Sequence, residues 1–369
     1  MTVIVAGAGM AGLVAGARLR ELGVPAVVHE KGTRAGGSML LSSCVIWRHR
    51  EWEDFRRECP GGDIRLQRLV WERLDESIEW LMSLGAVPVW DATGNPRTVG
   101  KRLDPKQLVE TLLRVGPNEY TLGCEGVFIQ SSPAEPLILA TGGFSASSEL
   151  VTRYISPAAP LRLRANPWST GDGLLYALDR GAGVTSGMDE FYGRNMPDAP
   201  WGEDELVTAS QLYGRFARIF DETGEEFFER ESVSWSETNV VQATARRPGA
   251  RAYYLLDETA LAERVRDRAV AEIVETAPSE SRVPLSDLPF DPPPGTIAAL
   301  RVVASITHTI GGIRVDDRAR VLREDDTAID GLYAAGVDAG GVSTGGYASG
   351  LAQALVLGLT AAEDLADRA

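Results

Sequence analysis

The first thirty residues combine three glycines and an acid at a spacing that could bind a dinucleotide. Gly7, Gly9 and Gly12 form the pattern G-x-G-x-x-G after the apolar residues 2–6. Gly7 permits a tight turn, Gly9 lets backbone amides approach a pyrophosphate, and Gly12 lets a helix pack closely on a sheet. Glu30 lies eighteen residues after Gly12, where a carboxylate can accept hydrogen bonds from both hydroxyls of an adenosine ribose. The pattern predicts a dinucleotide site and leaves open which dinucleotide and which reaction.

The elements that must position these residues follow one another in the required order. Residues 2–6 read as a buried strand, the amphipathic run that ends at Gly23 as a helix, and residues 26–30 as a second strand. In this order the amino end of the helix faces the phosphate charge. We therefore expect a Rossmann-like unit, followed by a glycine-rich loop at 31–38.

The composition is that of an ordinary globular protein and excludes several partners. The chain has 369 residues, enough for two domains, with 44% hydrophobic and 24% charged residues. Its net charge of −15 argues against nucleic acid and against an anionic membrane surface. No apolar run reaches transmembrane length, and the apolar N-terminus lacks the basic region of a signal peptide. We expect a small-molecule substrate, with no nucleic acid and no membrane as partner.

Cysteine and lysine usage indicate the compartment and the source. Cys44, Cys59 and Cys124 are odd in number and lack C-x-x-C spacing, which argues against a disulfide framework, a thiolate zinc site and a cysteine-bound iron–sulfur cluster. We expect no metal site and a reducing, cytoplasmic compartment. Lysine at three positions beside abundant arginine is typical of a GC-rich bacterial genome.

Further elements along the chain indicate one domain interrupted by another. We expect helices at 51–86, at 105–113, after 170–173 and at 349–366, and strands at 125–130, 137–140, 313–315, 321–322 and 331–336. Residues 291–295, Asp-Pro-Pro-Pro-Gly, give the clearest linker signal. Glycine turns follow strands at both ends of the chain. The predicted fold is α/β: a discontinuous Rossmann-like nucleotide-binding domain (1–143 and 295–369) interrupted by a smaller α+β capping domain (144–294).

Several motifs besides the opening one resemble the flavoprotein family of fumarate reductase, succinate dehydrogenase and 3-ketosteroid Δ1-dehydrogenase. They are Ala-Gly-Gly-Ser at 35–38, Ile-Leu-Ala-Thr-Gly-Gly-Phe at 138–144, Gly-Asp-Gly at 171–173, His-Thr-Ile-Gly-Gly at 308–312, Gly-Leu-Tyr-Ala-Ala-Gly at 331–336 and Gly-Gly-Tyr-Ala-Ser-Gly-Leu-Ala at 345–352. They stand in the family's order over nearly the whole chain. The resemblance implies FAD as cofactor, an FAD-binding domain split by a capping domain, and a site between the two.

The resemblance also assigns residues to FAD. Asp338 matches an acid near the ribityl chain, although many members have that acid directly after the glycine, where this chain has Val337. A helix that begins near Ser349 would direct its free amides and dipole at flavin N1 and the C2 carbonyl. The cofactor-binding residues expected in full are Gly7, Gly9, Ala11, Gly12, Glu30, Lys31, Gly37, Ser38, Thr141, Gly142, Gly336, Asp338, Gly350 and Leu351.

Two residues are candidates for catalysis. His308 matches the histidine that fumarate reductases place against a substrate carboxylate, and it precedes Gly311-Gly312. Tyr347 could donate to a carbonyl oxygen or, when ionised, accept a proton from the α-carbon. The Tyr-Pro-Gly pattern of the ketosteroid dehydrogenases does not align cleanly with Tyr347. The spacing around His49 leaves its role open.

Two arginines of the fumarate reductases are missing. An approximate alignment puts Trp235 where the family has its proton-donating arginine, and residues 345–347, Gly-Gly-Tyr, where it has a carboxylate clamp. Without both arginines a dicarboxylate dianion would be poorly held and poorly protonated. The sequence therefore predicts an aromatic pocket for a neutral or singly charged ring compound, and fumarate is not the expected substrate.

These observations predict an FAD-dependent oxidoreductase that desaturates, or in reverse reduces, a C–C bond activated by a carbonyl. The substrate would be a ketone or a cyclic compound, and the electron partner is unknown. Two alternatives stay open: an FAD-dependent oxidase or hydroxylase on another bond type, and a flavin-binding protein whose catalysis has decayed.

Overall fold

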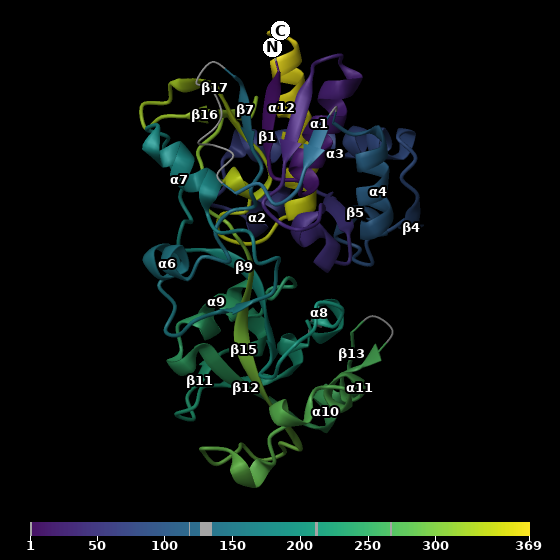
Figure 1. Ribbon diagram of the computed structural model, residues 1–369. Helices are drawn as coiled ribbons and strands as arrows, with labels where there is room; N and C mark the ends of the chain where they lie inside the picture. Colours follow the sequence, from purple (N-terminus) through teal and green to yellow (C-terminus); the bar gives the residue numbers. More distant parts are fainter. Residues whose placement is uncertain (1, 118, 126–134, 211–212, 266–267) are drawn as a thin grey trace. The chain divides into compact units, whose positions relative to one another are not determined.

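The computed structural model of the chain describes residues 2–117, 119–125, 135–210, 213–265 and 268–369 (Figure 1). The chain packs into two compact units: the first comprises 1–150, 165–190 and 308–369, and the second comprises 151–164 and 191–307. The predicted division, 1–143 and 295–369 around 144–294, differs from this packing in three places. Residues 144–150 and 165–190 pack with the first unit, and residues 295–307 pack with the second.

The first unit is built on a six-stranded sheet in the order β16-β17-β7-β1-β2-β6. The strands are β1 (Val3–Ala6), β2 (Ala26–His29), β6 (Glu119–Thr121), β7 (Leu137–Leu139), β16 (Arg320–Leu322) and β17 (Ala328–Ala334). All neighbours are parallel except β16, which is antiparallel to β17. The predicted Rossmann-like α/β fold is confirmed here: strands from both ends of the chain, β1 and β17, flank β7 in one sheet.

Four helices pack on this sheet or on each other in the first unit: α1 (Met10–Glu21), α3 (Ile64–Ser83), α4 (Pro105–Val115) and α12 (Gly350–Ala366). Helices α1 and α12 lie side by side (Figure 1). Gly358 on α12 permits this close approach, because a Cβ there would lie 2.7 Å from the carbonyl oxygen of Ala11. The helices predicted at 105–113 and 349–366 correspond to α4 and α12, with small shifts of their ends.

The helix predicted at 51–86 is two helices, α2 (Trp52–Glu58) and α3. Pro60, Gly61 and Gly62 interrupt it, because proline lacks an amide donor and glycine favours turns. Asp63 then begins α3 by accepting hydrogen bonds from the Arg65 and Leu66 amides.

Two predicted strands have other outcomes. The strand predicted at 313–315 is wrong: Ile313 and Val315 make isolated bridges, since glycines precede them and, within the described ranges, no continuous strand pairs with them. Of the strand predicted at 125–130, residues 126–130 lie outside the described residues.

The rest of the first unit supplies loops and a small sheet around the glycine turns. A three-stranded antiparallel sheet has the order β3-β5-β4, with β3 (Val45–His49), β4 (Pro88–Trp90) and β5 (Thr98–Leu103). The short helical elements are η1 (Gly37–Leu41), α6 (Ser148–Leu150), α7 (Asp172–Asp179) and η8 (Gly336–Asp338).

The second unit is an antiparallel-rich sheet with short helices. Its order is β11-β10-β12-β15-β8, and β9 also pairs with β15. The strands are β8 (Arg162–Leu163), β9 (Phe191–Pro197), β10 (Arg218–Phe220), β11 (Glu226–Phe228), β12 (Arg251–Leu256) and β15 (Ala298–Thr309), and β13 (Arg264–Val265) pairs with β14 (Arg268–Ala269). The α-helices are α8 (Leu206–Ala209), α9 (Thr238–Ala245), α10 (Glu258–Ala262) and α11 (Val270–Glu275).

The core of the second unit joins its sheet to its helices. Tyr213, Tyr254 and Leu300 are buried in one apolar cluster that also includes Val270 of α11. Short 3₁₀ or π turns connect the elements: η2 (Val151–Ile155), η3 (Gly214–Phe216), η4 (Arg230–Ser232), η5 (Pro248–Ala250), η6 (Ser279–Ser281) and η7 (Leu285–Asp287). The proline-rich residues 291–295 lie inside this unit, before β15, rather than at its boundary.

Candidate functional site

The three glycines of the opening pattern differ in what surrounds them. Gly7 has a φ of +106°, and a Cβ there would lie 2.2 Å from the carbonyl oxygen of Ala140. A Cβ on Gly12 would lie 1.8 Å from the Gly7 oxygen, whereas a Cβ on Gly9 would meet nothing within 4 Å. Gly7 and Gly12 are therefore required by packing, and Gly9 faces open space. This is the arrangement expected where a backbone must approach a phosphate closely.

Glu30 lies next to this turn, as predicted. One oxygen of its buried carboxylate accepts a hydrogen bond from the Ala8 amide (2.7 Å), and the other accepts one from the Gly32 amide (2.6 Å). These bonds fix the carboxylate at the end of β2. Each carboxylate oxygen can accept more than one hydrogen bond, so capacity remains for the hydroxyls of a ribose.

The loop at 36–38 lies against the same turn. The Gly36 amide donates to the Ala8 oxygen (2.7 Å), and a Cβ on Gly37 would lie 3.3 Å from Cα of Gly9. The Ser38 hydroxyl oxygen accepts a hydrogen bond from the side-chain amide of Asn166 (2.7 Å). The structure therefore brings the predicted residues Gly37 and Ser38 beside Gly9.

Two other predicted cofactor residues are occupied by contacts within the protein. The Lys31 ammonium forms an ion pair with Asp172 at the start of α7 (2.9 Å). Asp338 is 1% exposed, and its carboxylate accepts hydrogen bonds from the Thr141 amide, the Thr141 hydroxyl (2.9 Å) and the Gly143 amide (2.9 Å). Burial raises the pKa of Asp338, and these donors lower it in part. Asp338 thus joins the loop after β7 to the loop after β17.

The start of α12 presents free backbone amides. Ser349 caps the helix, since its hydroxyl oxygen accepts a hydrogen bond from the Ala352 amide (3.3 Å). Among the described residues, the amides of Gly350 and Leu351 have no hydrogen-bond partner. The Gln353 side chain donates to the Gly336 oxygen (2.8 Å), which fixes the helix start against the loop after β17. The N-terminus of this 17-residue helix therefore carries unused donors and a positive dipole end.

The two candidate catalytic residues lie next to this helix start. A Cβ on Gly350 would lie 3.1 Å from the His308 ring, so the imidazole packs on the first residue of α12. The rings of His308 and Tyr347 lie 6.2 Å apart between centroids, and the Tyr347 ring meets Trp47 edge-on at 5.7 Å. The sequence candidates His308 and Tyr347 are therefore brought together, although they are far apart in the chain.

Sequence reasoning left His49 undecided and missed Trp47. The His49 ring lies edge-on to Trp47 (5.3 Å) and stacks on Phe55 (5.3 Å), and it forms a hydrogen bond with the Tyr347 backbone. Burial lowers the pKa of His49 to about 4, so its imidazole is neutral at pH 7. The period-two spacing of Trp47 and His49 on β3 was the available signal that both face one side.

Trp235, at the position of the missing arginine, belongs to the second unit and is half-buried. The guanidinium of nearby Arg194 is buried, donates to the carbonyl oxygens of Gly193 (3.0 Å) and Ser236, and lies over the ring of Tyr192. Arg194 is therefore engaged by groups of its own unit.

The chain matches the family model described as "FAD binding domain" over residues 2–108 and 123–351. The chain belongs to this family. FAD as the cofactor is thereby confirmed.

Several known proteins are similar to the chain in sequence. The chain is 24% identical over its whole length to a probable fumarate reductase of Shewanella frigidimarina and covers 75% of that protein. It is 24% identical over its whole length to a Klebsiella pneumoniae NADH:fumarate oxidoreductase and covers 48% of that protein. A match to a Schizosaccharomyces pombe fumarate reductase, 25% identical, covers 54% of this chain and 46% of that protein.

Solved structures show the same fold. The structure of 3-ketosteroid Δ1-dehydrogenase from Sterolibacterium denitrificans is 18% identical, with all of both chains covered and a TM-score of 0.72. An open flavocytochrome c3 fumarate reductase is 20% identical, with 99% of this chain and 78% of that chain covered and a TM-score of 0.71. The predicted resemblance and fold class are confirmed, and the chain is an FAD-dependent oxidoreductase of this family.

Within the described residues, no group of three or more His, Cys, Asp or Glu side chains is placed to hold a metal ion. Likewise, no helix in the described ranges is both long enough and apolar enough to cross a membrane.

Proposed function

We propose that this protein desaturates, or in the reverse direction reduces, a C–C bond next to a carbonyl group. The observation that carries the proposal is the group formed by His308, Tyr347 and Trp47 at the start of α12. It combines a titratable phenol, an imidazole and an apolar wall beside free backbone amides. Desaturation next to a carbonyl needs a proton acceptor and a donor to the carbonyl oxygen, and these side chains can supply both.

The residues of the first unit fit FAD. The open space at Gly9, the fixed carboxylate of Glu30 and the Ser38 loop suit a dinucleotide, and the amides of Gly350 and Leu351 suit a group that gains negative charge. When bound, FAD supplies the acceptor or donor of hydride. In the proposal Ala11, Gly142 and Gly336 contact the cofactor through their backbone, and Asp338 and Lys31 position the loops that hold it.

The side chains have separate roles in this proposal. Tyr347 donates a hydrogen bond to the substrate carbonyl oxygen or accepts the α-proton, and His308 orients the carbonyl group. The neutral His49 fixes the Tyr347 backbone, since its ring hydrogen-bonds there. The second unit acts as the cap that excludes water from the reaction.

We further propose that the substrate is a ketone or a cyclic carbonyl compound and not fumarate. Trp235 and the residues Gly-Gly-Tyr at 345–347 replace the two arginines that would bind and protonate a dianion. The named relatives are fumarate reductases, so the substrate proposal rests on these replacements. The electron partner is unassigned, and cytoplasmic location and bacterial origin stay predictions from composition.

An anaerobic experiment tests the proposal. FAD-loaded protein is mixed with cyclic saturated ketones or with succinate, and photoreduced protein is mixed with the matching enones or with fumarate. We expect ketones to bleach the flavin band and enones to restore it, with succinate and fumarate slower by at least about 100-fold. Equal or faster reaction with the dicarboxylates would overturn the substrate proposal.

Variants test the assigned side chains in the same experiment. Tyr347→Phe should slow bleaching by about 10²- to 10⁴-fold while the flavin spectrum and affinity stay unchanged. Tyr176→Phe on α7 is the matched control and should keep the rate. Oxygen consumption with hydrogen peroxide release as the main reaction would favour the oxidase alternative. Tight FAD binding without turnover of any ketone or enone would favour the decayed flavoprotein.

A further inference from the structure

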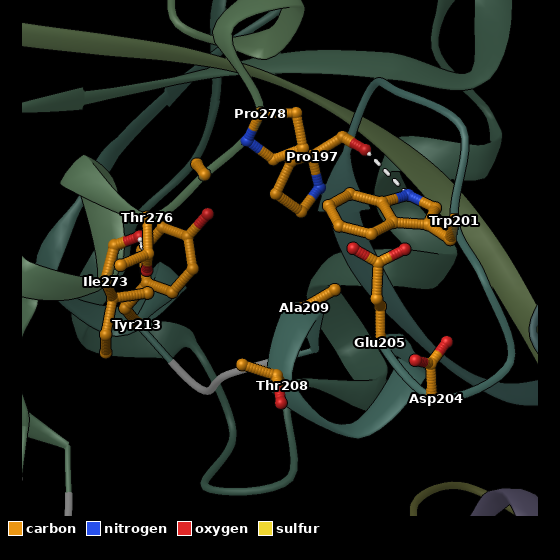
Figure 2. A pocket seen from close by; sticks show the side chains of 11 residues that line it. Pro197, Trp201, Asp204, Glu205, Thr208, Ala209, Tyr213, Ile273, Thr276 and Pro278 are labelled. Carbon is orange, nitrogen blue, oxygen red and sulfur yellow. Dashed lines mark hydrogen bonds between the residues drawn. The ribbon is translucent and has the colours of Figure 1, made fainter.

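The second unit contains a cavity of about 180 Å³, and none of the predicted site residues lines it (Figure 2). Its volume is smaller than the roughly 300 to 1,000 Å³ of clefts that hold drug-sized ligands. All of its lining residues lie in the second unit, so this unit forms the cavity by itself.

One side of the cavity combines an indole with two carboxylates. Trp201, Asp204 and Glu205 lie together there (Figure 2). The Trp201 indole N–H donates to the Pro197 oxygen (3.1 Å), and Glu205 accepts a hydrogen bond from the Gly202 amide (2.8 Å), so both side chains are held in place. Across the described part of the chain, neither Asp204 nor Glu205 has an ion-pair partner. This side therefore offers uncompensated negative charge next to an aromatic ring.

The opposite side is apolar and ends in a buried phenol. Ile273 and Tyr213 line it together with Thr276, and Pro278 lies beside Pro197 between the two sides (Figure 2). Tyr213 is 1% exposed, and its hydroxyl lacks a hydrogen-bond partner among the described residues. Burial raises the pKa of Tyr213, so the hydroxyl stays protonated. A buried hydroxyl without a partner is unfavourable, and a polar group of a ligand at this end of the cavity would relieve it.

We propose that this cavity binds a small organic cation, a protonated amine carried on an apolar body of about ten heavy atoms. The carboxylates of Asp204 and Glu205 would neutralise the ammonium group, and the Trp201 ring would contribute a cation–π interaction. The apolar body would pack on Ile273 and Pro278. An anion is disfavoured both by these carboxylates and by the net charge of −15.

Three probes of nearly equal size separate charge from shape. Phenethylammonium, 2-phenylethanol and 3-phenylpropionate are titrated by calorimetry into the chain with FAD bound, so the readout is binding and not turnover. We expect phenethylammonium to bind about 5- to 10-fold more tightly than the alcohol, and the carboxylate to bind most weakly. Added salt should narrow the gap between amine and alcohol. Equal affinities of the amine and the carboxylate would overturn the proposal.

Substitutions in the cavity test whether the probes bind there. Asp204→Asn combined with Glu205→Gln should remove the preference for the amine and leave the alcohol unaffected. Glu222→Gln combined with Glu229→Gln removes the same charge from exposed positions outside the cavity and should keep the preference. Trp201→Leu should weaken the amine at least about threefold, and thermal melts check that each variant is folded. If both charge pairs had the same effect, the cavity would not be the binding site.

Discussion

The two units bury an acidic side chain in different surroundings. In the first unit, Asp338 accepts hydrogen bonds from two backbone amides and the Thr141 hydroxyl. In the second unit, Glu237 is 1% exposed at a positive φ of 55°, and its carboxylate accepts a hydrogen bond from the Gly214 amide (2.7 Å). Burial raises the pKa of Glu237 to about 7, which the charge of Arg194 offsets in part.

The difference indicates how each unit uses a buried charge. Around Asp338 the donors all lie in the loop after β7, whereas Asp338 itself follows β17, so the carboxylate fixes these two loops to each other. Around Glu237 burial raises the pKa by more than the Gly214 and Arg215 amides and the charges of Arg194 and Arg215 lower it, so its ionisation falls near neutral pH. The first unit therefore uses its buried acid to join two loops, and the second contains a buried acid whose pKa of about 7 lets its charge change near neutral pH.

The largest effect should come from the glycines of the first unit. In Gly12→Ala the new Cβ would lie 1.8 Å from the Gly7 oxygen, so the turn and α1 must move apart. We expect a loss of about 4 kcal/mol or more in the free energy of unfolding, with no FAD retained. Urea unfolding of the flavin-free protein and absorbance after reconstitution measure both effects.

Gly9→Ala is the matched control, because a Cβ there meets nothing within 4 Å. We expect unfolding of the flavin-free protein to change by less than about 1 kcal/mol while FAD affinity falls at least about tenfold. Unchanged FAD affinity in Gly9→Ala would show that the space at Gly9 is not used by the cofactor.

The local part of the candidate site could be predicted from the sequence. Gly7, Gly9, Gly12 and Glu30 lie within thirty residues, and their turn, helix and strand follow from local spacing. The start of α12 was also predictable, since Ser349 is a favourable N-cap before a long apolar helix.

The rest depends on contacts between distant residues. Asp338 is 197 residues from Thr141, so its role as a link between two loops had no local signal. The contact between the rings of Trp47 on β3 and Tyr347 likewise forms only in the folded chain, because the two residues are far apart in the sequence. The cavity beside Trp201 has no motif at all, because its walls come from two segments far apart in the chain, 197–213 and 273–278.

The next largest effect should come from the titration of Glu237 in the second unit. Because its folded pKa of about 7 exceeds the unfolded value near 4.5, the folded state binds more protons between these values. The contribution of Glu237 to stability should be fully present below about pH 4.5 and should fall by roughly 3 kcal/mol as the pH rises through about 7. Glu237→Gln should lack this fall, whereas the exposed Glu222→Gln should keep it. Urea unfolding at pH 5 and pH 8 gives the difference.

A smaller effect is expected when the carboxylate of Asp338 is replaced by an amide. In Asp338→Asn an amide NH₂ replaces one carboxylate oxygen and faces the backbone donors, so at least one buried amide loses its acceptor. We expect a loss of about 2 kcal/mol in the free energy of unfolding at pH 7. Asp179→Asn, at an exposed position, should change it by less than about 0.5 kcal/mol. Equal effects of the two variants would contradict the linking role of Asp338.

The smallest change in unfolding free energy is expected for the helix caps of the two units. Ser349 caps α12 in the first unit, and Asp257 caps α10 in the second by accepting a hydrogen bond from the Ala260 amide (2.7 Å). Ser349→Ala and Asp257→Ala should each cost about 1 kcal/mol of unfolding free energy, because each leaves one helix amide without its acceptor.

The two cap variants should differ in flavin binding. Ser349 orders the same turn that presents the free amides of Gly350 and Leu351, so its replacement lets those amides fray and should lower FAD affinity about threefold or more. Asp257→Ala should leave FAD affinity unchanged, since α10 belongs to the other unit. Fluorescence titration of the flavin-free variants gives both affinities. Equal affinities for the two variants would mean that the N-terminus of α12 does not contact the flavin, and the roles proposed for Gly350 and Leu351 would be withdrawn.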